Sequence, residues 1–142
     1  MSLLLLSRRL LAAWFVLLGG CGDGPGRVGD RFVDLYFVEI DQARARPITS
    51  GLARQKLDEE LRLVAEVRRG VTPDRAKPTV YYRRRGADVA GDRARSTYEV
   101  RIRHGSDESR RRVLLTLERS DGRWTVGNFT LEDEAPESPL PR

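Results

Sequence analysis

The stretch LLTLERSDGRWTVGNFTL, residues 114–131, has the pattern of a β-hairpin and decides the predicted fold class. Leu115 and Leu117 are apolar and the residues between and after them are polar, which is the period of a strand with one buried face. Asp121-Gly122 is a strong signal for a two-residue hairpin turn, and residues 124–131 form the returning strand. We therefore predict an antiparallel pair with one face on a core.

Two further strands precede this hairpin. Residues 94–103 alternate strictly, with apolar Tyr98, Val100 and Ile102 separated by charged side chains. Residues 79–85 are rich in β-forming residues, and Gly86 and Gly91 bracket a predicted turn or short loop. The sequence thus predicts a curved antiparallel sheet of about four strands.

Helical patterns occupy the region before the strands. Residues 30–43 carry apolar side chains at spacings of three to four, which predicts an amphipathic helix capped by Asp30. Thr49 or Ser50 can cap a second helix, which basic residues and Gly70 end. Helices followed by a strand meander predict an α+β domain with N-terminal helices packed on the sheet.

The N-terminus has the composition of an export signal. Arg8 and Arg9 precede the apolar run 10–18, and Gly19 and Gly20 are small residues at a cleavage position. The apolar segment is too short to cross a bilayer, which needs about 20 residues. Adjacent arginines also occur in the twin-arginine export motif, but they are common in any signal, so we expect the general secretory route.

Leu18-Gly19-Gly20-Cys21 resembles the lipobox of bacterial lipoproteins. The resemblance implies cleavage before Cys21, diacylation of its thiol, and a lipid-anchored, periplasm-facing protein of the cell envelope. Gly22, rather than Asp, follows the cysteine, which favours the outer over the inner membrane. The alternative is a secreted protein cut near Gly20 with a free thiol.

We expect four segments. Residues 1–20 form the signal peptide, 21–29 a glycine-rich flexible tether, 30–131 the folded domain, and 132–142 a disordered acidic and proline-rich tail. Cys21 is the only cysteine, so no disulfide can form within the chain.

Three segments resemble the NTF2-like superfamily, whose cone-shaped α+β architecture is shared with cystatin-like proteins. RFVDLYFVEIDQARA (31–45) looks like its first helix, GDRARSTYEVRI (91–102) like the strand that opens with Gly-Asp-x-Ala, and residues 114–131 like its last hairpin. The resemblance implies helices on a curved antiparallel sheet. The superfamily contains enzymes and members without catalysis, so the fold alone decides no activity.

The candidate pocket residues are Tyr36, Asp41 and Tyr98, which the cone could gather at its apolar mouth. His104, the single histidine, is predicted in a turn, and no catalytic, cofactor or metal-ligand constellation is evident. We predict a non-catalytic binding or scaffold module. The alternative is a small isomerase-like or hydrolase-like pocket enzyme that uses Asp41 or Tyr98.

Arginine supplies nearly all of the basic charge, because Lys56 and Lys77 are the only lysines among 26 Lys and Arg residues. A candidate basic surface on the solvent face of the sheet comprises Arg83, Arg85, Arg101, Arg103, Arg110 and Arg112. Such a surface could meet anionic lipid head groups or acidic glycan. Alternatively, Glu99, Glu118 and the acidic tail neutralise it.

Other partners are a small apolar ligand, an envelope protein or a second copy of the chain in a homodimer. The like charges of these arginines argue against a dimer interface that includes them. An exported domain seldom meets nucleic acid, so we expect no nucleic-acid partner despite the formal net charge of +5.

Overall fold

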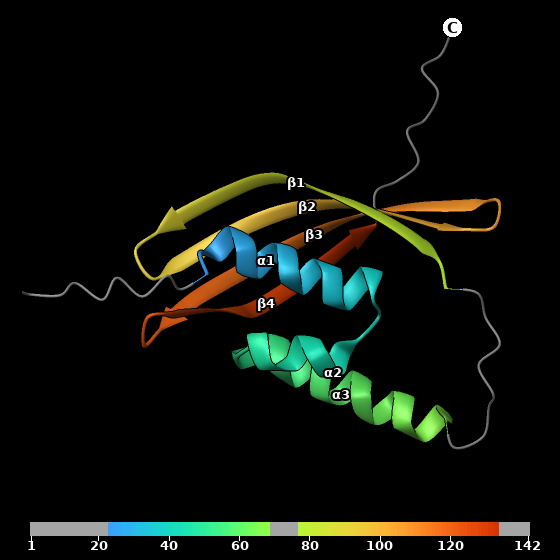
Figure 1. Ribbon diagram of the computed structural model, residues 1–142, viewed down its shortest axis with the longest axis horizontal. Helices are drawn as coiled ribbons and strands as arrows, with labels where there is room; N and C mark the ends of the chain where they lie inside the picture. The colour runs from blue at the N-terminus through green and yellow to red at the C-terminus, as the bar shows by residue number, and fades with distance from the viewer. Residues whose placement is uncertain (1–22, 69–76, 134–142) are drawn as a thin grey trace, which may run out of the picture.

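A layer of helices covers one face of a four-stranded antiparallel sheet in the computed structural model, which describes residues 23–68 and 77–133 (Figure 1). The strands lie in the order β1-β2-β3-β4, and each pairs with the next through a hairpin. Their bounds are β1 Thr79–Ala90, β2 Arg93–His104, β3 Asp107–Ser120 and β4 Arg123–Asp133. The helical segments are α1 Pro25–Val33, the π-helical η1 Asp34–Val38, α2 Gln42–Ala45, the 3-10 helix η2 Arg46–Ile48 and α3 Gly51–Arg68. The predicted α+β architecture is confirmed.

The core lies between the helices and the inner face of the sheet. Every second side chain of the inner strands is buried there, as the alternation predicted, and Tyr98, Val100, Val113 and Leu117 are fully covered. From the helical side Phe32 packs between the rings of Tyr36 and Phe129, with centroid distances of 5.5 and 5.2 Å, and this aromatic cluster joins α1 to the sheet. Burial of each such side chain stabilises the fold by about 1.5–3 kcal/mol.

The first helix begins earlier than the sequence pattern predicts. Its first residue is Pro25, Gly24 is the N-cap, and Val28 and Gly29 are buried against the sheet. Proline suits the first helical position, since its φ is already helical and its missing N–H would lack a partner there. Asp30 is therefore not the cap. The predicted tether 21–29 and domain start at residue 30 are wrong from Pro25 onward.

The predicted helix 30–43 is also not continuous. The chain widens into the π-helical turn η1, where the Glu39 N–H donates to the Asp34 carbonyl oxygen five residues back, and then turns at Ile40, whose φ of 55° lies in the left-handed region. Asp41 starts a new helix, because its Oδ1 accepts a hydrogen bond from the Arg44 backbone N–H at 3.0 Å. Apolar periodicity alone could not reveal this break, since the side chains on both sides of it face the same core.

Two strand boundaries also differ from prediction. Strand β1 continues to Ala90, and Gly86 lies within it instead of opening a loop. Strand β4 includes Glu132 and Asp133, because Arg112 and Arg111 of β3 pair with them, so the predicted tail begins too early. The signal peptide, Cys21 and residues 134–142 lie outside the described residues.

Candidate ligand-binding groove on the open face of the sheet

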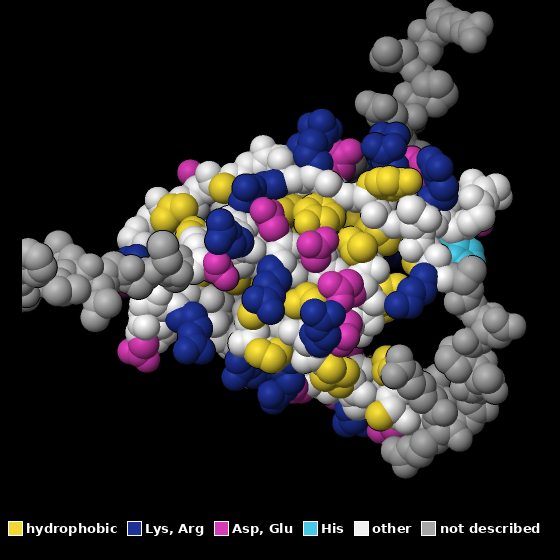
Figure 2. Space-filling view, viewed as in Figure 1, with side chains coloured by type: hydrophobic (Ala, Val, Ile, Leu, Met, Phe, Trp, Pro, Cys, Tyr) yellow, Lys and Arg dark blue, Asp and Glu magenta, His cyan; other side chains and the backbone are white. Residues whose placement is uncertain are grey.

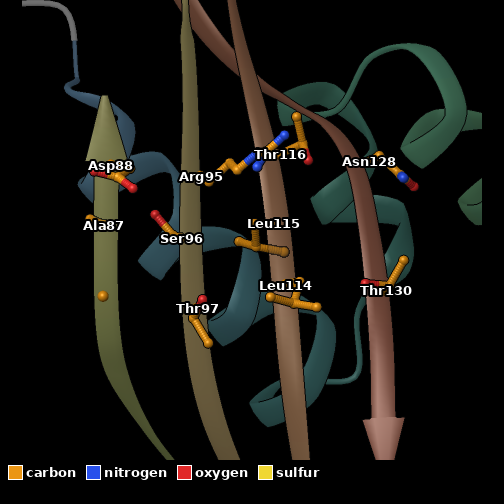
Figure 3. Close-up of a pocket in the computed structure, with 11 residues that line it drawn as sticks. Ala87, Asp88, Arg95, Ser96, Thr97, Leu114, Leu115, Thr116, Asn128 and Thr130 are labelled. Atoms are coloured by element: carbon orange, nitrogen blue, oxygen red, sulfur yellow. The ribbon is translucent and has the colours of Figure 1, made fainter. Parts of the chain in front are cut away.

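A groove of about 550 Å³ lies on the sheet face that the helices leave uncovered (Figure 3). Two rows of cross-strand neighbours form most of it. One row runs from Gly86 through Thr97 and Leu114 to Thr130, and the next contains Asp88, Arg95, Thr116 and Asn128. Because all four strands contribute, the groove depends on the register of the whole sheet.

Bulges on both edge strands flank these rows. On β1 the register shifts between Arg84 and Gly86, so Arg85 is an extra residue. On β4 the partners of Thr116 and Leu117 are Asn128 and Val126, so Gly127 is the extra residue. Bulges bend a strand and increase its local twist. We attribute the local hollowing of an otherwise continuous sheet face to this pair of bends.

The groove contains a guanidinium and a carboxylate that have no ion-pair partner among the described residues. Arg95 and Asp88 are direct cross-strand neighbours. Figure 3 shows that Arg95 extends from β2 across β3 toward Thr116, away from Asp88. Both side chains are therefore available to a ligand, the guanidinium for an anion and the carboxylate for hydroxyl donors.

The rest of the groove is lined by uncharged polar groups around an apolar floor. Thr97, Thr116 and Thr130 offer hydroxyls, and Leu114 lies between them. The Asn128 amide oxygen accepts a hydrogen bond from Lys56 Nζ at 3.0 Å, which orients its amide nitrogen as a donor. This combination of donors, acceptors and methyl groups suits a hydroxyl-rich ligand that carries negative charge.

The predicted basic surface lies on the same face, and all of its arginines have carboxylate partners. Glu99 receives Arg83 and Arg85, the latter with an Nε to Oε2 distance of 2.6 Å, and the hydrogen bond from Arg85 holds the pKa of Glu99 below its usual value. Glu108 forms ion pairs with Arg101, Arg103 and Arg110, and Glu132 forms one with Arg112. Of the predicted neutralising acids, Glu99 and Glu132 take part, whereas Glu108 was missed.

The three predicted pocket residues do not form one site. Tyr98 is fully buried and its hydroxyl donates to Asp30 Oδ1 at 2.8 Å, whereas the Tyr36 hydroxyl donates to Glu60 Oε1 at 2.7 Å. Burial is the main cause that raises the pKa of both tyrosines, and these carboxylate hydrogen bonds raise it further. Asp41 caps α2. His104 ends β2 beside the Gly105 turn, where the sequence predicted it.

On the helical side, Figure 2 shows basic and acidic side chains interspersed, with apolar groups between them. Within residues 23–68 and 77–133, no three His, Cys, Asp or Glu side chains gather in a way that could hold a metal ion. None of the helices that the structure describes is both long and apolar enough to span a membrane. The open-face groove, which is lined by charged and polar side chains, is the candidate ligand site.

Comparison with known proteins bears on the fold. No protein-family model matches the chain, and no curated protein matches it either. Among solved structures, a designed NTF2-like protein superposes with a TM-score of 0.52, covering 75% of this chain and 96% of its own, at 13% identity. The domain has an NTF2-like fold. At this identity the likeness shows the NTF2-like fold alone and assigns no ligand or activity.

Sequence reasoning missed Arg95 and Asp88. Arg95 lies at a polar position of the predicted strand 94–103, and Asp88 lies three residues after the predicted strand 79–85. Several other charged residues lie near both of them in the sequence. What distinguishes them is that they line the groove and have no ion-pair partner among the described residues, and both properties depend on cross-strand register. The available signal was the run of Thr97, Thr116 and Thr130, hydroxyl residues at alternating polar positions of three strands.

Proposed function

We propose that this chain is a lipid-anchored protein of the cell envelope whose NTF2-like domain binds an acidic saccharide, without catalysis, in the groove on the open face of the sheet. The observation that carries the proposal is Arg95. It extends into the groove without an ion-pair partner among the described residues, while six other arginines of the same face share Glu99, Glu108 and Glu132.

The chemistry of the lining favours this ligand class. A guanidinium binds a carboxylate or phosphate through two parallel hydrogen bonds, which a lysine cannot do. Asp88 and the threonine hydroxyls can accept and donate hydrogen bonds to sugar hydroxyls, and Leu114 can contact the apolar face of a sugar ring. A groove on an open sheet face, lined by charged and hydroxyl side chains, suits an extended polar chain better than the small apolar ligand that the sequence also allowed.

The non-catalytic part of the proposal rests on how the predicted catalytic candidates are used. The Asp41 carboxylate caps α2, and the Tyr98 hydroxyl is buried in a hydrogen bond between β2 and α1. Each group therefore has a structural role, and they have different partners. A pocket enzyme built on either residue would have to give up that role.

The anchor part of the proposal rests on the lipobox pattern at Leu18-Gly19-Gly20-Cys21 and places the domain on the periplasmic side, with the outer membrane favoured. Intact-mass measurement of the membrane fraction tests it. We expect loss of residues 1–20 and a mass increase from acyl chains, both absent in Cys21→Ala. An unmodified, soluble product from the native sequence would contradict the anchor.

Saccharide binding is tested by calorimetric titration with an oligogalacturonate, with neutral maltooligosaccharide of equal length as the control ligand. We expect affinity for the uronate to fall about tenfold or more in Arg95→Gln, which corresponds to about 1.4 kcal/mol. Arg93→Gln is the matched control, because Arg93 is two residues away on the same strand face and does not line the groove.

An equal loss of uronate affinity in both variants would mean that the net charge of the face, and not Arg95 in the groove, causes the binding. Binding of the neutral sugar with the same affinity as the uronate would refute an acidic ligand. A homodimer through this face would cover the groove instead. Light scattering of the same samples distinguishes this case by mass.

A further inference from the structure

We infer that the end of the domain that carries the β1–β2 and β3–β4 turns rests on the phospholipid head-group layer of the membrane that holds the anchor. The inference rests on the proposed acylation of Cys21 and adds an orientation to it. We define the turn end as the two hairpin turns with their flanking residues, 89–93 and 120–123, together with residues 23–27 at the start of α1.

The length of chain between anchor and domain limits where the domain can lie. Cys21 is four residues from Pro25, the first residue of α1. A fully extended chain spans at most about 3.6 Å per residue, so Pro25 lies within about 14 Å of the acylated thiol. The 12-residue strand β2 is about 40 Å long by comparison. The short connection therefore keeps Pro25, and the end of the domain around it, close to the membrane surface.

The fold decides which part that is. Figure 1 shows the first turn of α1 at the same end of the sheet as the β1–β2 and β3–β4 turns, with the β2–β3 turn at the opposite end. At the turn end Val89 is 61% exposed, and Arg93 and Arg123 are exposed without ion-pair partners among the described residues. An apolar side chain and two unpaired guanidinium groups are suited to lipid head groups.

The charges of the turn end nearly balance, so the anchor rather than electrostatic attraction holds it in place. Asp23 pairs with Arg27 at 3.2 Å and Asp92 with Arg119 at 2.8 Å. Arg93 is the cross-strand neighbour of Glu118 on β3, and Asp121 is two residues before Arg123 in the β3–β4 turn. A surface of this kind neither repels an anionic membrane nor depends on it. We therefore expect the orientation to persist at high salt.

The orientation separates the two charged regions of the open face. Arg103 is ten residues from Arg93 along β2, about 33 Å, which exceeds the Debye length of about 8 Å at physiological salt. Of the arginines that the sequence suggested for head groups, Arg101, Arg103 and Arg110 thus lie toward the remote end, whereas Arg83, Arg85 and Arg112 lie near the middle of the sheet. Arg95 is only two residues from Arg93, about 7 Å, so the groove opens next to the membrane and its ligand approaches along the surface.

Matched single-cysteine variants of the acylated full chain test the orientation. If Cys21 is acylated, an introduced cysteine is the only free thiol. Ser120→Cys places it at the β3–β4 turn, and Ser106→Cys places it at the opposite β2–β3 turn; both serines are exposed. Each thiol carries a nitrobenzoxadiazole fluorophore, and the proteins are reconstituted in phosphatidylethanolamine–phosphatidylglycerol vesicles with a nitroxide attached to some head groups.

We expect at least threefold stronger quenching at residue 120 than at residue 106, unchanged between 0.1 and about 0.5 M salt, in line with the weak role of charge. Insertion of 12 Gly and Ser residues after Gly22 should reduce this difference. Equal quenching of the two labels on protein of acylated mass would overturn the orientation and leave the anchor intact. Protein that is not acylated overturns both.

Discussion

Gly29 is the position where a single added methyl group tests the packing of α1 on the sheet. A Cβ at this position would lie 2.6 Å from the Tyr98 hydroxyl oxygen, and 3.5 Å from both Tyr98 Cζ and a methyl group of Leu115. Only the first distance is a clash. The same hydroxyl donates the hydrogen bond to Asp30, so Gly29→Ala forces either the ring or α1 to move.

Three contributions set the expected magnitude. Alanine is favoured over glycine inside a helix by about 0.5–1 kcal/mol. Overpacking a well-filled site costs about 1–3 kcal/mol, and loss of the hydrogen bond adds about 0.5–1.5 kcal/mol. We expect Gly29→Ala to lower the free energy of unfolding by about 1–3 kcal/mol, with a fall in Tm of about 4–8 °C for each kcal/mol.

The sign should reverse when the hydroxyl is absent. Tyr98→Phe by itself costs about 0.5–1.5 kcal/mol, because it removes one hydrogen bond from a half-exposed carboxylate. In that background the remaining neighbours of a Cβ at Gly29 are at ordinary van der Waals distance. Gly29→Ala should then stabilise the domain by about 0.5–1 kcal/mol, from helix propensity alone.

Urea unfolding of the four proteins of this cycle measures the coupling, on the chain that begins at Gly22. Gly26→Ala is the control within α1, because a Cβ there meets only the flexible end of the Arg84 side chain. An additive cycle would refute the reasoning. So would a cost of Gly29→Ala no larger than that of Gly26→Ala.

Further predictions concern the α3 interface and alkaline pH. Lys56→Met should lower the free energy of unfolding by about 1–3 kcal/mol in urea, because Lys56 Nζ donates to the Phe129 carbonyl oxygen at 2.6 Å and lies 5.0 Å from its ring centroid. Leu57→Ala should cost about 2–5 kcal/mol, and Leu63→Ala, at a 47% exposed position of the same helix, less than about 0.5 kcal/mol. Burial and the hydrogen bond to a carboxylate raise the pKa of Tyr98 above its usual 10.0, so its contribution to stability is complete below pH 10 and is lost as the pH rises further. Urea unfolding between pH 8 and 11 should therefore show a shallower alkaline decline in Tyr98→Phe than in the native chain.

The strands were predictable because their signal is local. Alternation buries Tyr98 and Val100 while Glu99 and Arg101 remain on the open face, and Asp121-Gly122 adopts the positive φ angles that its turn requires. A period of two places all the apolar side chains of a strand on the same face of the sheet, so it indicates which face is buried. The hairpin order then follows from short connections.

The start of α1 was not predictable, because its first turn has the composition of a linker. Glycine at positions 24, 26 and 29 lowers the helix propensity of this segment. The segment is nevertheless the start of a helix because α1 packs on the sheet. Gly29 is required where α1 approaches the Tyr98 hydroxyl, and Pro25 is tolerated because it is the first helical residue. The tertiary contact outweighs the local preference here, so a tether was predicted where the helix lies.

The candidate groove illustrates a different limit, because the availability of a charged side chain is a property of register rather than of sequence. Arg83 and Arg95 are both arginines on polar positions of neighbouring strands, yet the first lies opposite Glu99 and is paired. The second lies opposite Asp88 but extends to the other side, toward Thr116. The bulges at Arg85 and Gly127 shift the partners at both edges of these rows, and removing one bulge residue would turn the side chains of that edge strand beyond the bulge to the other face. The register therefore directs the unpaired guanidinium of Arg95 into the groove, which is why we propose that it binds a ligand there.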